Sequence, residues 1–416
     1  MTRLDRHAIC VGLLIFCILA DSQSYRTKKG ICKRCSCEKL NAGPNQTLRL
    51  DCSRLEANDV EDLLGYGEDE GHGGAWTLPY EASQDYRIIK IILDANSINH
   101  LRRLPPLKEE FPNATRESET GSTVNVTPES VNSTGFDIHG NSTASPSPPS
   151  DDFTMLIEVS FRANHVKRID PGAFAALSNT ICSIDLANND LTYDALPGSV
   201  FGGDFSNQRY EPLPNLKKLN LARNMLHSLD AKIFEHISFT LEELNLQWNS
   251  LGNSLDTVTE AALSTLTKLK TLNLADVGIS SFPEGLAHAL ISLENLRLDG
   301  NKLAVVPTSL SMASSSLLYL NLNRNPITKI NATSFVESVH GSAWSKLETL
   351  DISAMQELTY VLKGSFENLK GLRTLRCAYN QKLMHFDEEA FRLMGDDEME
   401  WERWKGFQLK EVNTIM

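Results

Sequence analysis

The chain has 416 residues, of which 41% are hydrophobic, and its formal net charge is −13 at pH 7. The hydrophobic content is sufficient for a core, and the length allows two or three ordinary domains. The acidic balance argues against nucleic acid and anionic lipid surfaces as electrostatic partners, because both attract clustered Lys and Arg.

Residues 1–22 are predicted to be a signal peptide. Arg3 and Arg6 precede an apolar run from Ala8 to Ala20, which small polar residues follow. The run is too short to span a bilayer comfortably, so a short membrane anchor is the weaker alternative. No later stretch is long and apolar enough to span a membrane. The chain is therefore expected to be secreted, or held at the cell surface if a longer form carries an anchor.

Residues 23–64 are predicted to form a cysteine-rich amino-terminal cap. In an oxidising compartment its four cysteines are expected to form disulfides. Zinc is the alternative, but the Cys-x-x-Cys-x-Cys spacing suits one structural tetrahedron poorly. The spacing alone leaves three pairings open. The four cysteines are Cys32, Cys35, Cys37 and Cys52.

Residues 88–104 hold the first copy of a framework, Leu-x-x-Leu-x-Leu-x-x-Asn-x-Leu, that recurs about ten times. This period is typical of a leucine-rich repeat, which builds a solenoid. Repeats two to ten are predicted to occupy residues 153–394. In chain order the ten copies begin at Ile88, Leu156, Ile181, Leu216, Leu241, Leu269, Leu293, Leu317, Leu347 and Leu372.

Residues 105–152 are rich in Ser, Thr, Pro and Asn and contain few large apolar side chains. Such a segment cannot bury enough surface to offset its ordering entropy, so we expect a disordered insert between the first and second repeats. Sequons for N-glycosylation cluster within it. The predicted acceptors in the whole chain are Asn45, Asn113, Asn125, Asn132, Asn141 and Asn331.

Counting from the first framework leucine, places one, four and six of each repeat are predicted to point into the core. The strands of successive repeats are expected to stack in parallel, about 4.8 Å apart. Asparagine at place nine should satisfy buried backbone groups of the following turn. Val277 and Met355 stand at this place in two repeats, whose turns are expected to be less firmly held. A second register predicts an aromatic spine on the convex side, formed by Phe174, Phe234, Phe335, Phe366 and Phe391.

Cys182 and Cys377 lie in the third and tenth repeats. Seven strand spacings separate them by roughly 34 Å, which is too far for a disulfide. Cys377 is therefore predicted to be a buried thiol, and Cys182 a partly exposed one without reactivity. Residues 395–416 are predicted to be an acidic tail or the start of a truncated further repeat. Either this segment covers the open end of the solenoid or the chain derives from a longer protein, and we favour the second.

Side chains at places three, five, seven and eight are predicted to face outward from the concave sheet. Aromatic residues and arginine are enriched at binding hot spots, although exposed aromatics also occur on surfaces without a partner. A cation–π contact between Arg223 and Trp248, in adjacent repeats, is geometrically allowed. Asparagines at place five are assigned to the scaffold. The candidate ligand-binding residues are Arg223, Trp248, Arg297, Asp299, Tyr319, Arg324, Arg376 and Tyr379.

No catalytic residue, metal ligand or cofactor site is predicted. The sequence contains no Gly-x-Ser-x-Gly or His-Glu-x-x-His motif and no phosphate-binding glycine loop. The plentiful Asp and Glu follow the repeat, so an enzymatic role is not expected.

The framework and the cysteine cluster resemble those of extracellular leucine-rich-repeat proteins, such as Toll-like receptors, Slit, neuronal repeat receptors and small proteoglycans. The resemblance implies an α/β solenoid, a curved horseshoe with a parallel sheet on its concave face and a disulfide-bonded cap that pairs Cys32 with Cys37 and Cys35 with Cys52. It implies binding of an extracellular protein ligand, in adhesion or receptor-type signalling. An extracellular-matrix glycoprotein and a secreted enzyme inhibitor are the alternatives, and a dimer remains open.

Overall fold

The structure is a computed structural model. It describes residues 35–40, 47–58, 60, 87–104, 155–202, 213–313, 315–336 and 344–391, together with the backbone of 76–78 and 107–109. The predicted signal peptide, the predicted tail and nearly all of the predicted insert lie outside these residues.

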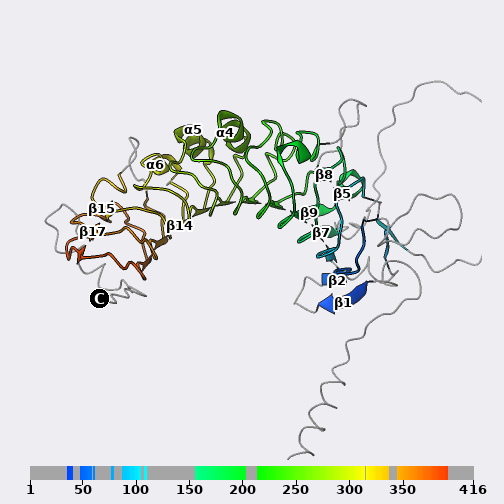
Figure 1. The fold of residues 1–416 in the computed structure, drawn as a ribbon, viewed down its shortest axis with the longest axis horizontal. Coiled ribbons are helices and arrows are strands. Elements are labelled where there is room, and N and C mark those ends of the chain that lie inside the picture. The colour runs from blue at the N-terminus through cyan, green and yellow to red at the C-terminus, as the bar shows by residue number, and fades with distance from the viewer. Residues whose placement is uncertain are drawn as a thin grey trace, which may run out of the picture.

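The described residues form an arc whose concave side carries one long sheet (Figure 1). Within this part of the chain, β1 pairs antiparallel with β2, and every later pair of neighbouring strands is parallel. The predicted fold class, a leucine-rich-repeat solenoid, is thereby confirmed. The strands of this sheet are, in spatial order, β1 (Ser36–Leu40), β2 (Thr47–Asp51), β4 (Ile88–Ile92), β7 (Leu156–Ser160), β9 (Ile181–Asp185), β10 (Lys218–Asn220), β11 (Glu243–Asn245), β12 (Thr271–Asn273), β13 (Asn295–Arg297), β14 (Tyr319–Asn321), β16 (Thr349–Asp351) and β18 (Thr374–Arg376).

The outer side of the arc carries shorter elements, with α4, α5 and α6 on the convex edge opposite the strands (Figure 1). The helical elements are η2 (Ala175–Leu177), η3 (Tyr193–Ala195), α4 (Thr257–Ser264), α5 (Glu284–Ala289) and α6 (Leu310–Ala313). The short strands are β5 (His100–Leu101), which pairs with β8 (Arg168–Ile169), and β15 (Lys329–Ile330), β17 (Tyr360–Val361) and β19 (His385–Phe386), which pair in that order. Because a helix is wider than a strand, this layer bends the stack toward the sheet.

The aromatic spine is not continuous through the described repeats. At one end Phe174 stacks on Phe201, which the sequence register did not include, with ring centroids 6.1 Å apart. At the other end Phe366 contacts Phe335 at 6.1 Å and Phe391 at 5.0 Å. Between them Phe234 is buried in a turn of the fourth repeat, and the next three repeats have helices, α4, α5 and α6, that bury Leu263, Leu286 and Leu310. The fifth to seventh repeats therefore fill the convex layer with helical leucines in place of phenylalanine.

The framework leucines and asparagines behave as the repeat predicts. In the fourth repeat, Leu216, Leu219 and Leu221 are buried in the core. In the fifth, Asn249 Nδ2 donates to the carbonyl oxygens of Leu221 and Leu246, at 3.0 and 2.9 Å. Each place-nine asparagine therefore ties its own turn to the turn of the preceding repeat. The buried asparagines of this ladder are Asn96, Asn164, Asn189, Asn224, Asn249, Asn301, Asn325 and Asn380.

The turns that lack this asparagine are held from the next repeat. The Val277 amide donates to Asn301 Oδ1 at 3.2 Å, and the Met355 amide donates to Asn380 Oδ1 at 2.7 Å. The neighbouring asparagine thus reaches across the repeat boundary to both turns, as it does in repeats that have their own asparagine, and the weaker hold on these two turns stays a prediction.

The amino-terminal cap is continuous with the solenoid. Its strand β2 pairs in parallel with β4, so the cap supplies a strand of the main sheet. Strand β1 then pairs with the other edge of β2. Cys35 and Cys52 form a disulfide, one of the two pairs that the resemblance implies. Cys37 is also disulfide-bonded, whereas Cys32 lies outside the described residues.

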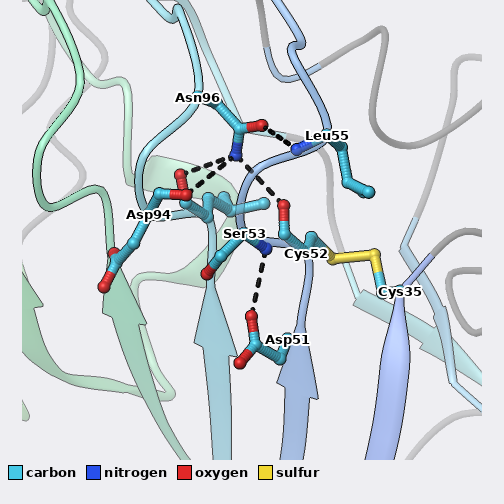
Figure 2. Close-up of a disulfide and its surroundings, with 8 residues drawn as sticks. Cys35, Asp51, Cys52, Ser53, Leu55, Asp94 and Asn96 are labelled. Carbon is cyan, nitrogen blue, oxygen red and sulfur yellow. Dashed lines mark hydrogen bonds between the residues drawn. A yellow bond between two sulfur atoms is a disulfide. The ribbon is translucent and has the colours of Figure 1, made fainter.

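The first repeat is bonded directly to this cap (Figure 2). Asn96 Nδ2 donates to the Cys52 carbonyl at 3.0 Å, and Asn96 Oδ1 accepts from the Leu55 amide at 2.8 Å. The asparagine ladder thus begins at the disulfide-bonded cap, and the cap covers this end of the solenoid.

One short strand lies inside the segment predicted to be a disordered insert. Strand β6 (Leu107–Glu109) pairs in parallel with β3 (Trp76–Leu78), which precedes the first repeat. Residues 107–109 are therefore ordered, contrary to the expected disorder, while the boundaries of the insert stay a prediction. The low apolar content of the segment gave no signal for a pairing with a strand so far back in the chain.

Candidate recognition surface on the concave face

The eighth place of every described repeat lies in the left-handed region of backbone space, with φ between 53° and 69°. This conformation is costly for a residue with a Cβ atom, and Gly or Asn adopt it at lower cost. The turn is held by main-chain bonds, for example from the Trp248 amide to the Ala275 carbonyl at 3.0 Å. Sequence reasoning did not foresee this conformation. From the first repeat to the tenth, place eight is occupied by Ala95, Ala163, Asn188, Arg223, Trp248, Asp276, Gly300, Arg324, Ala354 and Tyr379.

The structure brings Arg223 and Trp248 together, as their shared place in adjacent repeats allows. The Arg223 guanidinium carbon lies 5.0 Å from the Trp248 ring centroid, within the range of a cation–π contact. Trp248 is nevertheless 45% exposed, so the contact orders the pair without burying it.

An ion network joins the sixth, seventh and eighth repeats. Arg324 Nη2 donates to Asp276 Oδ2 and to Asp299 Oδ2, both at 2.9 Å. Arg297 Nε donates to Asp299 Oδ1 at 3.1 Å. These bonds raise the pKa of Arg324 further, with the bond to Asp276 as the largest favourable cause. Asp276 was not among the predicted ligand-binding residues, although it completes this network.

Gly300 makes the network possible, because Arg324 reaches Asp276 over it. A Cβ atom on Gly300 would lie 2.0 Å from Asp276 Oδ1 and 3.0 Å from Arg324 Nη2. The sequence signal was a glycine at place eight flanked by Asp and Arg at the same place in the neighbouring repeats.

Gly300→Ala is expected to cost about 1–2 kcal/mol of stability, because alanine is strained at positive φ and displaces the Asp276 carboxylate. Urea denaturation of the variant measures this cost. Repeating the substitution in an Asp276→Ala background should reduce it. An equal cost in both backgrounds would mean that the close contact with Asp276 contributes nothing.

Asp299 was predicted to face outward, and the structure corrects this. The residue is only 3% exposed, because Arg297 and Arg324 lie over its carboxylate. Asp299 therefore orients the two arginines, and a ligand would meet their guanidinium groups first.

Tyr319, Arg376 and Tyr379 extend the surface toward the last described repeats. Arg376 Nη1 lies 3.8 Å from Asp351 Oδ2. Burial raises the pKa of the Tyr319 phenol, and the charge of Asp351 raises it further, so Tyr319 remains a neutral hydrogen-bonding group. Tyr379 is 66% exposed. The eight predicted residues thus form two groups, the Arg223–Trp248 pair and the patch from Arg297 to Tyr379.

The place-five asparagines have a scaffold role. Each accepts a hydrogen bond from the backbone amide two residues later, as Asn245 Oδ1 does from Gln247 at 3.1 Å. This local hydrogen bond closes the turn at the end of the strand and occupies the side-chain oxygen. The other members are Asn220, Asn273 and Asn321.

A groove of about 660 Å³ runs along the opposite edge of the sheet, where the strands begin. Glu242 lies between Lys217 and Lys270 on its wall, 3.1 and 2.7 Å from the two ammonium groups. The bond to Lys270 and then that to Lys217 lower the pKa of Glu242. Glu242 is therefore paired with a lysine on each side along this wall.

The described residues offer little for chemistry. Burial raises the pKa of both free thiols, Cys182 and Cys377, to about 11, so both are protonated near neutral pH and poorly nucleophilic. No group of three or more His, Cys, Asp or Glu side chains among these residues could hold a metal ion. Within the same part of the chain, no helix has the length and apolarity to cross a bilayer.

Of the predicted glycosylation acceptors, Asn331 falls within the described residues. It is partly exposed, and its Oδ1 accepts from the amide and the hydroxyl of Thr333, at 3.0 and 2.7 Å. Its occupancy stays a prediction. Asn45 and the acceptors of the insert lie outside the described part of the chain.

Comparisons with known proteins agree with the fold. A family model described as Leucine rich repeat matches residues 291–340. Toll-like receptor 3 of Boselaphus tragocamelus is 27% identical over 241 residues, which are 55% of this chain and 25% of that protein. Chaoptin of Drosophila melanogaster is 31% identical over 219 residues, which are 50% of this chain and 15% of that protein. The chain thus spans a quarter or less of the length of these two relatives.

Among solved structures, a chain of the octameric complex of Latrophilin 3, Unc5D and FLRT2 is 18% identical with a TM-score of 0.45, and the match covers 79% of this chain and 80% of that one. The curated relatives are extracellular leucine-rich-repeat proteins. The predicted resemblance to this group is confirmed.

Proposed function

We propose that this chain is a non-enzymatic extracellular recognition protein that binds a protein ligand on its concave face, in adhesion or receptor-type signalling. One observation carries the proposal. Arg223, Trp248 and Tyr379 occupy left-handed turns that Gly or Asn would form at lower cost, and they extend bulky side chains over the concave surface. Their size contributes nothing to the turn, which supports a role in contacting a partner.

The proposed location outside the cell has three supports. Residues 1–22 have the pattern of a signal peptide. The cap contains the Cys35–Cys52 disulfide, and such bonds persist in oxidising compartments. The similar proteins are extracellular.

Trp248→Ala and Tyr379→Ala are each expected to weaken ligand binding by about 2 kcal/mol, or roughly 30-fold. The loss follows from removing an exposed aromatic anchor from the centre of a contact. The ligand would first be captured by crosslinked pull-down with the glycosylated full chain, and each variant then titrated against the captured protein.

Tyr360→Ala is the matched control. Tyr360 is 45% exposed, as Trp248 is, but it lies on β17, outside the concave sheet. Unchanged binding by folded Trp248→Ala and Tyr379→Ala chains would refute the proposal. Capture of a hydrolase in a one-to-one complex would favour an inhibitor, and deposition in a detergent-insoluble matrix would favour a structural glycoprotein.

A further inference from the structure

The charged residues of the patch between the sixth and tenth repeats are layered by sign. The carboxylates lie underneath, since the side chains of Asp276, Asp299 and Asp351 are 12%, 5% and 8% exposed. The guanidinium groups lie on top, since those of Arg297, Arg324 and Arg376 are 41%, 47% and 50% exposed. The patch therefore presents positive charge, although the three acids balance the three bases and the whole chain carries a net charge of −13.

The buried carboxylates also fix the arginines before a ligand arrives. Arg324 makes both of its bonds to the acids through Nη2, which leaves Nε and Nη1 of the guanidinium without a partner within the described part of the chain. An arginine that is already ordered loses less side-chain entropy on binding, and its planar donors suit the two oxygens of a carboxylate.

The spacing of the arginines suits an extended polypeptide. Arg297, Asn321, Asp351 and Arg376 are register partners across β13, β14, β16 and β18. Three strand spacings place Arg297 and Arg376 about 14 Å apart, the length of roughly four extended residues.

We propose that the guanidinium surface of Arg297, Arg324 and Arg376 binds an acidic segment of the partner protein. The inference rests on the proposed function and adds the chemistry of the ligand. A sulfated glycan fits less well, because dense polyanions are held by clustered unpaired cations, and each of these arginines already shares a carboxylate. The half-buried Tyr319 between them offers a neutral hydroxyl and a ring edge, which suit a peptide.

The test compares Arg297→Gln/Arg376→Gln with Arg373→Gln. The double variant keeps Arg324, so the most buried acid, Asp299, remains paired. Arg373 lies three residues before Arg376 in the same repeat and is 76% exposed, but its partner Glu348 is 45% exposed and offsets its charge at the surface. The probes are a short fluorescent peptide rich in Glu and Asp with one Tyr, its charge-reversed Lys counterpart, and a heparin oligosaccharide.

We expect the unmodified full chain to bind the acidic peptide, and to bind it more tightly at low than at high salt. The double variant should bind this peptide at least about tenfold more weakly than the unmodified chain does. The Arg373→Gln control should bind it as tightly as the unmodified chain. Equal binding of the Lys peptide, or no loss in the double variant, would overturn the inference. So would tighter binding of heparin that depends on the same arginines, or a dimer of this chain that the double variant dissolves. If Trp248→Ala weakens the captured ligand and the double variant does not, the proposed function stands and this inference fails. If neither variant weakens it, both fail.

Discussion

Asn301→Ala is expected to lower the free energy of unfolding by about 3–6 kcal/mol. Asn301 Nδ2 donates to the carbonyls of Leu274 and Leu298, at 2.7 and 2.9 Å, and its Oδ1 accepts from the amides of residues 277–279. Alanine would leave the Leu274 carbonyl and the amides of residues 277–279 without these bonds, at about 1–3 kcal/mol for each group that water cannot reach, whereas the Leu298 carbonyl keeps its bond from Asn325 Nδ2 at 2.9 Å. The cost should be large here because the sixth repeat has Val277 at the place where eight of the ten repeats have their own asparagine.

Asn295→Ala in the same repeat is the control for this prediction. Asn295 is half-buried on β13, and its Nδ2 makes one long bond, of 3.4 Å, to Thr271 Oγ1. We expect a change within about 0.5 kcal/mol. Urea denaturation followed by circular dichroism measures both variants. Similar midpoints for the two would mean that the buried asparagine ladder does not hold the repeats together.

Leu246→Ala is expected to cost about 2–5 kcal/mol. Leu246 occupies place six of the fifth repeat and is fully buried. Truncation removes its transfer free energy and leaves a cavity between neighbouring repeats that the framework cannot close. Because each repeat contacts only its neighbours, the loss should be local. Hydrogen exchange should therefore quicken in the fourth to sixth repeats more than at the ends.

Gln247→Ala, one residue later, is the control, because it changes place seven of the same repeat in place of the inward-facing place six. Gln247 faces outward, and its Oε1 accepts from Asn273 Nδ2 at 3.1 Å. Its loss should change stability by less than about 0.5 kcal/mol. Equal melting temperatures for Leu246→Ala and Gln247→Ala would contradict the inward direction of place six.

The repeating parts of the fold could be predicted because the reason for them lies within one or two repeats. Leu219 is buried and Asn224 turns inward because their places in the framework require it. The separation of Cys182 from Cys377 followed from the same spacing, and both thiols are free. The Arg223–Trp248 contact was also within reach, since adjacent repeats bring equal places together.

Features that depend on more than adjacent repeats were missed. The convex layer changes from stacked rings to helices, so Phe201 and the leucines of α4–α6 fell outside the predicted spine. Strand β6 pairs with β3 across the whole first repeat. Asp276 meets Arg324 only because Gly300 leaves room between them.

The sequence by itself determined the unit of this protein, namely which places enter the core, which asparagines close the turns and which residues reach the concave face. It did so because each repeat makes the same short-range contacts. Only the tertiary structure decided the electrical character of that face. In its ionic patch three acids accompany three arginines, and burial of Asp299 beneath Arg297 and Arg324 leaves the arginines outermost. That layering depends on contacts between side chains of three consecutive repeats, which the pattern of a single repeat does not specify.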